Sequence, residues 1–246
     1  MTNNHSVAHL GQFIEGLPLG EGAFGSVIEA THVATQTKVA VKKVSKVMDH
    51  ESISALSVQS EMELAMLCAN NHVVKTYGLL ETADHHLVVM EHCSNGTMSD
   101  WLRRNLYGVG ESVAAVLVYQ ILLGINALHS KNVAWLDCKP ENIMFKKNGK
   151  LGISDFGLAA AFKNKDTAHV WGAGSLMFMP PEYVNKDARK NPFKGDIFSL
   201  GATFYDILFG PQASKHCQVF NPNISPRQPK LPWLAHSARH AGLPAA

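Results

Sequence analysis

Cysteine is scarce in this sequence of 246 residues. The four cysteines lie far apart and form no C-x-x-C pair: Cys68, Cys93, Cys138 and Cys217. Structural zinc sites and disulfide frameworks need cysteines at close, regular spacing, so neither is indicated. Free thiols in a reducing compartment are the default expectation.

The chain also lacks an excess of charge of either sign. It holds 22 Lys and Arg against 20 Asp and Glu, a formal net charge of +2. A strongly basic balance would favour nucleic acid or an anionic membrane surface as a partner. We therefore expect no nucleic-acid partner and no membrane partner, and the sequence contains no argument about oligomeric state.

The sequence shows neither the pattern of a signal peptide nor that of a membrane span. Residues 1–5 have neither the basic nor the apolar region of a signal peptide. The most apolar stretch, Val113–Leu128, is interrupted by Gln120, Gly124 and Asn126. We expect it to be too short and too polar to span a bilayer, but suited to a buried helix. These features predict an intracellular, cytoplasmic protein.

Histidine is common, with 13 copies, but shows no metal-binding spacing. We interpret the histidines, His85, His86 and His129 among them, as surface or helix-capping residues.

The composition, with 46% hydrophobic and 17% charged residues, is typical of a soluble globular protein. Over residues 12–46 the residue pattern alternates along the chain, as it does in a hairpin of strands around a glycine turn. Residues 51–69 have helical periodicity. Two short apolar strands follow, Val73–Leu80 and His86–Met90. Five strands and one helix predict a small β-rich lobe over about residues 12–90.

The second half of the chain is predicted to be mainly helical. A polar linker at 91–96 precedes helices at 97–106, 112–130 and 195–209. Asn148-Gly149 between two apolar runs predicts a further hairpin. After Gly210 the chain is rich in proline and loses its periodicity, so we expect residues 211–246 to form an irregular tail.

A glycine-rich segment, Gly20-Glu21-Gly22-Ala23-Phe24-Gly25-Ser26-Val27, begins the candidate site. Residues without a Cβ allow backbone amides to approach a triphosphate closely. The same pattern also suits a tight hairpin turn with no ligand, so alone it is weak evidence. Val27 and Ala40 would form an apolar roof over a flat base.

Lys42 lies in the apolar strand Val39-Ala40-Val41-Lys42, where an ammonium group needs a partner. The helix at 51–69 offers Glu61 and Glu63. We favour Glu61 as the ion-pair partner that would position Lys42 on phosphates, with Glu63 as the second choice. The alternative is a pair of solvated surface charges.

Four polar residues follow the helix that ends near His129. Asp137 suits the role of orienting an attacking hydroxyl. Lys139 suits that of a cation near a transferred phosphoryl group, and Asn142 suits that of a metal ligand. Asp155, in Asp155-Phe156-Gly157, suits magnesium, which prefers oxygen ligands. Singly, each could be a turn or capping residue. Together with Lys42 they indicate phosphoryl transfer.

These motifs, in this order, resemble the eukaryotic protein kinase family over residues 12–210, and Lys139 resembles the serine/threonine branch. The resemblance implies a two-lobed α+β fold that transfers the γ-phosphoryl group of ATP, with Mg²⁺, to serine or threonine of protein substrates. It assigns catalysis to Asp137 and Lys139 and metal binding to Asn142 and Asp155. It assigns nucleotide binding to Leu19, Gly20, Glu21, Gly22, Ala23, Phe24, Gly25, Val27, Ala40, Lys42, Glu61, Met90, Glu91 and Cys93.

The resemblance extends to a substrate-docking segment. Met179-Pro180-Pro181-Glu182 looks like the family's Ala-Pro-Glu, and Gly174-Ser175 looks like its substrate-facing Gly-Thr. It therefore assigns docking of the protein substrate to Ser175 and Glu182. The segment Asp196–Gly201 resembles the buried helix that anchors the catalytic loop.

The chain departs from the family pattern in three ways. Trp135-Leu136-Asp137 stands where the family has His-Arg-Asp, so the usual docking charge for an activation-loop phosphate is missing. Our hypothesis is that Trp135 fills volume left by small residues at Ala65 and Thr76. We expect a C-terminal lobe that is abbreviated relative to the family, and Glu182 has no obvious arginine partner.

Two other functions fit parts of the pattern. A pseudokinase that binds ATP and acts as a signalling scaffold is favoured by Trp135 and Leu136, but the motif carboxylates and lysines are all retained. A small-molecule kinase is disfavoured by the segment around Ser175 and Pro180-Pro181-Glu182, which looks suited to peptide docking. An active protein kinase is the interpretation that we adopt.

Overall fold

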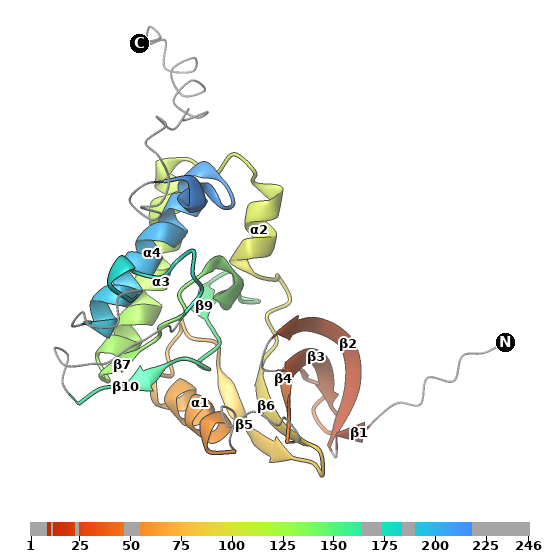
Figure 1. Cartoon of the computed structure of the whole chain (residues 1–246). Coiled ribbons are helices and arrows are strands. Elements are labelled where there is room, and N and C mark those ends of the chain that lie inside the picture. The colour runs from red at the N-terminus through yellow and green to blue at the C-terminus, as the bar shows by residue number, and fades with distance from the viewer. Residues whose placement is uncertain are drawn as a thin grey trace, which may run out of the picture.

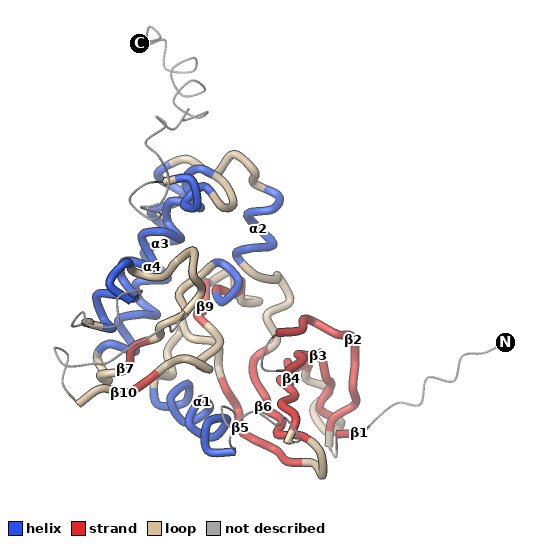
Figure 2. Tube along the Cα trace, in the orientation of Figure 1, coloured by secondary structure: helices blue, strands red, loops and turns tan. Residues whose placement is uncertain are grey.

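The computed structural model describes residues 9–10, 12–22, 25–46, 55–163, 174–183 and 190–217. Ala23, Phe24 and residues 218–246 therefore lie outside the described residues. Within these limits the chain forms the predicted two-lobed α+β fold. Strands gather in one lobe and helices in the other (Figures 1 and 2).

The N-terminal lobe is built on one antiparallel sheet with the strand order β1-β2-β3-β4-β6-β5. It contains the five predicted strands and one additional short strand, β1. The strands are β1 (His9–Leu10), β2 (Phe13–Gly22), β3 (Gly25–His32), β4 (Lys38–Ser45), β5 (Thr76–Glu81) and β6 (His85–Glu91). Strand β2 is irregular around Pro18, which has no N–H to donate to the ladder.

The two faces of this sheet differ, because successive side chains in a strand point to opposite sides. One face packs a core that includes Ile28, Val41, Leu87 and Val89. The other face meets helix α1 (Ala55–Leu67) through Val58, which packs with Val44 and Val88. Lys42 lies two residues from Val44 and so projects from the face that α1 covers.

The C-terminal lobe is helical and begins after the linker. Its helices are α2 (Met98–Arg104), α3 (Glu111–His129) and α4 (Pro192–Phe209), with 3-10 turns η1 (Pro140–Asn142), η2 (Pro181–Tyr183) and η3 (Ala213–His216). Its strand pairs are β7 (Val133–Ala134) with β10 (Ala160–Ala161), and β8 (Ile143–Phe145) with β9 (Leu151–Ile153). The hairpin predicted at Asn148-Gly149 is confirmed, and Gly149 adopts a left-handed φ of 79° there.

The start of one helix departs from the sequence prediction. Helix α4 begins at Pro192 and not at 195, because the Asn191 side chain accepts from the backbone amides of Phe193 and Lys194 and caps the helix. The segment after Gly210, for which we predicted an irregular tail, contains the 3-10 turn η3. The amide of Ser214 donates to Asp206 at 2.7 Å, so η3 is tied to α4.

One hydrophobic cluster joins the two lobes. It includes Ala65 and Val73 from the N-terminal lobe, and Ile125, Leu128 and Ile153 from the C-terminal lobe. The backbone reinforces this junction at β9. Ile153 N donates to the carbonyl of His72, and its own carbonyl accepts from Val74 N, both at 2.9 Å. The lobes therefore share a core as well as a linker.

Helix α3 is apolar on more than its buried face. Ala114, Ile121 and Ile125 are buried, whereas Val116 and Tyr119 are 60% and 62% exposed. Among the described residues, α3 is the one helix that is long and apolar enough to cross a membrane by length and composition. The expectation that this stretch is too short and too polar was wrong on that criterion. One face of the helix packs against β9 and α4.

The interpretation of the histidines as surface or capping residues is wrong at one position in the sheet. His86 lies on β6 and is 7% exposed. Its Nδ1 lies 3.5 Å from Glu81 Oε1. His86 pairs with Val44 of β4, so the alternation of the strand places its side chain on the face that α1 covers.

Candidate active site

The glycine turn connects β2 to β3 at one end of these strands. Gly22 pairs with Gly25, and Gly20 pairs with Val27. Gly25 has a φ of 132°, and a Cβ there would lie 2.0 Å from the carbonyl oxygen of Lys43. Only glycine fits this position. At Gly20 an added Cβ would meet no atom within 4 Å, so the backbone there faces open space.

The predicted apolar roof lies on the same face as Lys42. Val27 is directly opposite Lys42 in the β3–β4 ladder, and Ala40, two residues before Lys42, is opposite Met90 in the β4–β6 ladder. These four side chains share one face because of the two-residue period of a strand. Leu19, which precedes the turn, is 47% exposed.

Lys42 makes two ion pairs that connect three elements. Its Nζ lies 2.7 Å from Glu61 Oε1 on α1 and 3.2 Å from Asp155 Oδ1. The ion pair with Glu61 is the one that we favoured. The other candidate, Glu63, is exposed and accepts from Gln59. Burial lowers the pKa of Lys42, but the charges of Asp155 and Glu61 outweigh it, and the net effect raises that pKa.

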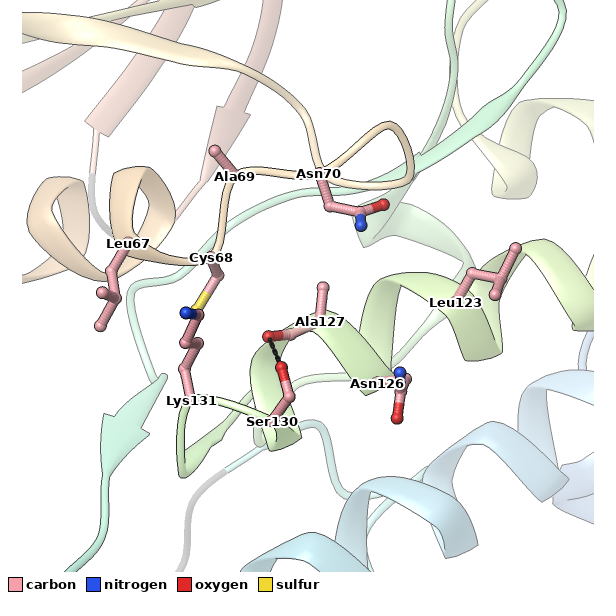
Figure 3. Close-up of a pocket in the computed structure, with 9 residues that line it drawn as sticks. All are labelled: Leu67, Cys68, Ala69, Asn70, Leu123, Asn126, Ala127, Ser130 and Lys131. Atoms are coloured by element: carbon pink, nitrogen blue, oxygen red, sulfur yellow. Dashed lines mark hydrogen bonds between the residues drawn. The ribbon is translucent and has the colours of Figure 1, made fainter.

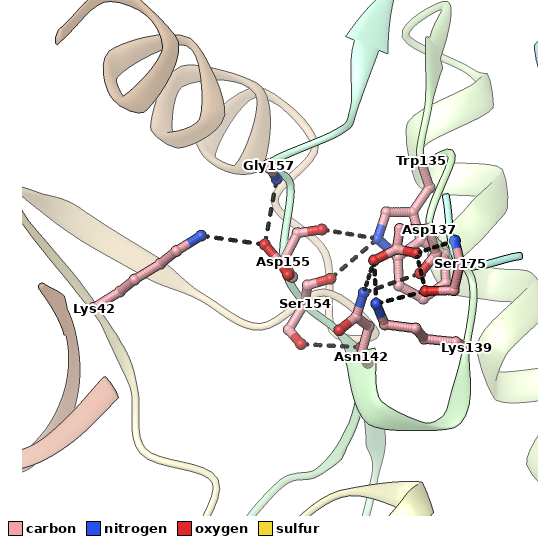
Figure 4. A network of polar contacts seen from close by, with 9 residues as sticks. All are labelled: Lys42, Trp135, Asp137, Lys139, Asn142, Ser154, Asp155, Gly157 and Ser175. Atoms are coloured by element: carbon pink, nitrogen blue, oxygen red, sulfur yellow. Dashed lines mark hydrogen bonds and ion pairs between the residues drawn. The ribbon is translucent and has the colours of Figure 1, made fainter. Parts of the chain in front are cut away.

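Asp137 lies at the centre of a dense polar network (Figure 4). Lys139 Nζ lies 2.6 Å from Asp137 Oδ2, and Asn142 Nδ2 donates to the same oxygen at 2.8 Å. Ser175 donates to Asp137 Oδ1 through its backbone N at 3.1 Å and its Oγ at 3.0 Å. Both carboxylate oxygens are therefore held, and residues from two separate loops orient Asp137.

Ser175 also accepts from Lys139 at 2.9 Å. This serine was assigned to substrate docking, and the structure places it directly against the candidate catalytic pair. Glu182, the other assigned docking residue, lies on η2 and makes no ion pair with any of the described residues. The segments 164–173 and 184–189 on either side lie outside the described residues.

The candidate metal ligands Asn142 and Asp155 lie on neighbouring turns. Ser154 N and Oγ donate to the carbonyl of Asn142 at 2.9 and 3.0 Å, which joins the two segments. Asn142 uses Nδ2 for its bonds to Asp137, so its amide oxygen is the atom left for a cation. The described residues contain no cluster of three His, Cys, Asp or Glu side chains suited to a metal. Two oxygen ligands completed by phosphate oxygens and water suit Mg²⁺.

Trp135 has a function in this network that the sequence reasoning missed. It is fully buried, in the same hydrophobic cluster as Ala65 and Phe156. Its indole Nε1 donates to the carbonyls of Ser154 and Asp155 at 3.0 and 3.1 Å. Asp155 has a left-handed φ of 56°. The indole therefore fixes the backbone at a residue whose conformation is uncommon for a side chain with a Cβ.

Asp196 anchors this loop from α4. It is fully buried and accepts from the backbone amides of Trp135 and Leu136, at 2.8 and 2.7 Å. Its Oδ2 also lies 2.7 Å from His129 Nε2. The interpretation of His129 as a surface or simple capping residue was therefore incomplete. This contact joins residues far apart in the sequence, so no local spacing could have indicated it.

Leu136 packs into an apolar cluster where the family pattern has an arginine. The cluster comprises Ala134, Leu136, Tyr183 and Phe193, with Leu158, Ala160, Phe162 and Met179 packed against it. Leu136 has a left-handed φ of 68° and is 9% exposed. Apolar packing therefore links the candidate catalytic loop to the segment before α4.

The linker residues assigned to adenine, Glu91 and Cys93, lie at the end of β6 and just beyond it. Glu91 N donates to Lys75 O at 2.8 Å. The Cys93 carbonyl accepts from Gly96 N at 3.2 Å and turns the linker. Burial raises the pKa of Cys93 to about 12, so its thiol is neutral at physiological pH.

A pocket of about 250 Å³ lies between the end of α1 and the end of α3 (Figure 3). Leu67, Cys68 and Asn70 line one side, and Asn126 and Lys131 belong to the other. Burial raises the pKa of Cys68 to about 11. No sequence motif had indicated this pocket.

Comparison with known proteins identifies the class of this fold and site. The model of the protein kinase domain matches residues 13–229. Because this match covers most of the chain, the chain belongs to the protein kinase family.

Individual relatives are serine/threonine kinases. A probable serine/threonine-protein kinase of Dictyostelium discoideum is 30% identical over 207 residues, 83% of this chain and 40% of that protein. An Aurora kinase of Schizosaccharomyces pombe is 32% identical over 203 residues, 82% of this chain and 56% of that protein. Serine/threonine-protein kinase SIK2 of Gallus gallus is 31% identical over 193 residues, 78% of this chain and 24% of that protein. This chain thus spans 24–56% of the length of these three relatives.

Proposed function

We propose that this chain is an ATP-dependent serine/threonine protein kinase. The observation that supports it most is that two sets of polar residues are assembled in one structure. Lys42 contacts both Glu61 and Asp155. Asp137 is held by Lys139 and Asn142. An intracellular, cytoplasmic location and protein substrates belong to the same proposal.

In this proposal Asp137 orients the serine or threonine hydroxyl and accepts its proton as the oxygen attacks the γ-phosphorus. The bond between that phosphorus and the β–γ bridging oxygen breaks, and ADP departs with the electron pair. Lys139 stabilises charge on the transferred group, and Lys42 aligns the α- and β-phosphates. Asn142 and Asp155 would hold Mg²⁺, which neutralises phosphate charge.

The first test is ATP turnover by the purified chain with generic serine- and threonine-containing peptides. We expect phosphate on serine or threonine. Asp155→Asn should abolish transfer while retaining the fold, because Asp155 projects into the polar network and not into the core. Asp84→Asn, in the exposed β5–β6 turn, is the matched control and should keep the wild-type rate.

The ion pair provides a second matched comparison. Glu61→Gln and Lys42→Met should each lower turnover by about tenfold or more, because phosphate alignment is lost. Glu63→Gln, on the exposed side of the same helix, should have no effect. Near-normal turnover in Asp155→Asn would refute the metal assignment. ATP binding by wild-type protein without any turnover would instead support the pseudokinase scaffold.

A further inference from the structure

Lys146 is a buried cation directly after β8, and its side chain is 8% exposed. Its Nζ lies 2.9 Å from Glu91 Oε2 and donates to the carbonyls of Asn71 and Val73, both at 3.2 Å. An ammonium group has three N–H donors, and three acceptors lie within reach here. A buried cation is costly unless its donors are matched in this way.

The fold leaves room for this side chain at one glycine. Gly152 pairs with Met144 in the β8–β9 hairpin. A Cβ added to Gly152 would lie 2.9 Å from Lys146 Cδ and 3.4 Å from its Cγ. The lysine stem therefore passes over a position without a side chain, and a larger residue at 152 would displace it.

Glu91 connects the lysine to the N-terminal sheet. It is the last residue of β6 and pairs with Val39 of β4. Its Oε2 accepts from Lys75 N at 3.3 Å in addition to contacting Lys146. The Lys146–Glu91 pair thus joins the end of the sheet to the hairpin of the helical lobe.

One side-chain bond and two backbone contacts attach the end of the linker to the same hairpin. Asn95 Nδ2 donates to the carbonyl of Lys146 at 3.1 Å, and Phe145 N donates to the carbonyl of Gly96 at 2.9 Å. A bridge between Thr97 and Met144 continues the contact. Residues 95–97 therefore run along β8, and the Lys146–Glu91 pair holds the start of the linker at the end nearest the sheet.

We propose that Lys146 is a positioning residue that holds linker 91–97 in its nucleotide-binding geometry. This inference rests on the proposed function, in which the backbone of Glu91 and Cys93 faces adenine. A linker already held in the bound geometry loses less conformational freedom when the nucleotide binds. Loss of the pair weakens nucleotide binding more than chemistry, because Asp137 and Lys42 are held by other contacts.

The test compares Lys146→Met, Glu91→Gln and the double variant with wild type and with Lys147→Met. Lys147 is the exposed neighbour on the same hairpin and serves as the control. ATP affinity is measured by calorimetry with Mg²⁺, and KM for ATP and kcat by peptide phosphorylation. In both single variants the Kd and KM for ATP should rise about fivefold or more, with kcat within about twofold. The double variant should resemble the weaker-binding single variant, because both changes remove one interaction.

Hydrogen exchange without nucleotide gives a readout independent of activity. The amide of Phe145, which donates to Gly96, should exchange faster in Lys146→Met and not in Lys147→Met. If Lys146→Met fails to fold, Glu91→Gln decides, because Lys146 there keeps its two carbonyl acceptors. Unchanged ATP affinity in a folded variant would overturn the inference, even with a lower melting temperature. If the wild-type protein does not bind ATP, the proposed function fails. In that case the exchange experiment still tests the restraint on the linker, and an unchanged exchange rate of the Phe145 amide in Lys146→Met would reject it.

Discussion

The indole of Trp135 combines a packing contact with a polar one. Its ring is fully buried in the cluster that joins the lobes, and its N–H reaches the carbonyls of Ser154 and Asp155. The hypothesis that Trp135 compensates for small neighbours accounts for the ring alone. The hydrogen bonds indicate that Trp135 also controls the backbone on which Asp155 is presented.

Substitution at Trp135 separates these two contributions. Trp135→Phe keeps a ring but removes the donor, and it should cost about 1–3 kcal/mol of stability from the unpaired carbonyls. Turnover should fall by about tenfold or more, and it should respond less to added Mg²⁺, because the backbone that presents Asp155 loses its support. Trp135→His should destabilise by about 1–4 kcal/mol through lost volume, and Ala65→Leu should restore part of that loss.

Urea unfolding and Mg²⁺-dependent kinetics measure the two effects. Trp101→Phe, at a partly buried tryptophan on α2, is the matched control. Equal Mg²⁺ dependence in Trp135→Phe and Trp101→Phe would show that the indole N–H does not position Asp155. A coupling energy below about 0.3 kcal/mol between positions 135 and 65 would show that these side chains do not share a packing site.

Residues with local signatures could be predicted from the sequence, and residues defined by distant contacts could not. Lys42, Asp137, Asn142 and Asp155 stand in short motifs, and periodicity placed Glu61 on the correct helix. The contact between His129 and Asp196 has no such signature. Long-range side-chain pairs depend on how elements pack, which a one-dimensional period does not encode.

Secondary-structure elements were predicted best where burial imposes a period. The strands of the sheet and helices α1 and α3 follow the alternation and helical spacing of apolar residues. The start of α4 was missed by three residues because the cap at Asn191 outweighed the apolar pattern. Capping is a local hydrogen-bond effect, and apolar periodicity is insensitive to it.

Gly124 tests how α3 supports the junction between the lobes. A Cβ there would lie 2.7 Å from the carbonyl oxygen of His72 and 3.3 Å from Ile153 Cδ1. Alanine gains about 1 kcal/mol of helix propensity over glycine. The His72 carbonyl is held by Ile153 N and has little freedom to move. The clash should therefore win, and Gly124→Ala should destabilise by about 1–3 kcal/mol.

The free energy of chemical unfolding measures this balance. Asn126→Ala, on the exposed side of α3, is the control, and its unfolding free energy should lie within about 0.5 kcal/mol of that of wild type. A stabilised Gly124→Ala protein would mean that the His72 segment yields, and that the junction tolerates a wider spacing.

At the scale of the molecule, the two lobes meet through apolar packing and backbone bonds, and the loop around Asp137 is held without a docked phosphate. Leu136 lies in an apolar cluster, so the position offers no cation to a phosphorylated residue. Buried contacts among Leu136, Tyr183 and Phe193 supply the order instead. Thr167, a threonine of the segment between Asp155 and Glu182, lies outside the described residues, and Ser175 already donates a hydrogen bond to Asp137.

Phosphatase treatment of the purified protein should therefore leave its peptide-phosphorylation rate within about twofold. Leu136→Arg should lower stability, because it places an unpaired charge among apolar side chains. Activity before and after treatment, with mass spectrometry to confirm phosphate removal, is the measurement. A tenfold fall would indicate that a basic residue such as Lys163 docks a phosphate.

The outer surface of α3 has a consequence for how the protein behaves in concentrated solution. Val116, Tyr119 and Leu122 are exposed along this helix, and neighbouring apolar side chains on a surface promote self-association. We therefore expect self-association through these side chains to occur at concentrations where the protein is still folded. Val116→Glu and Tyr119→Glu should raise the concentration at which light scattering increases, while stability stays within about 0.5 kcal/mol of wild type.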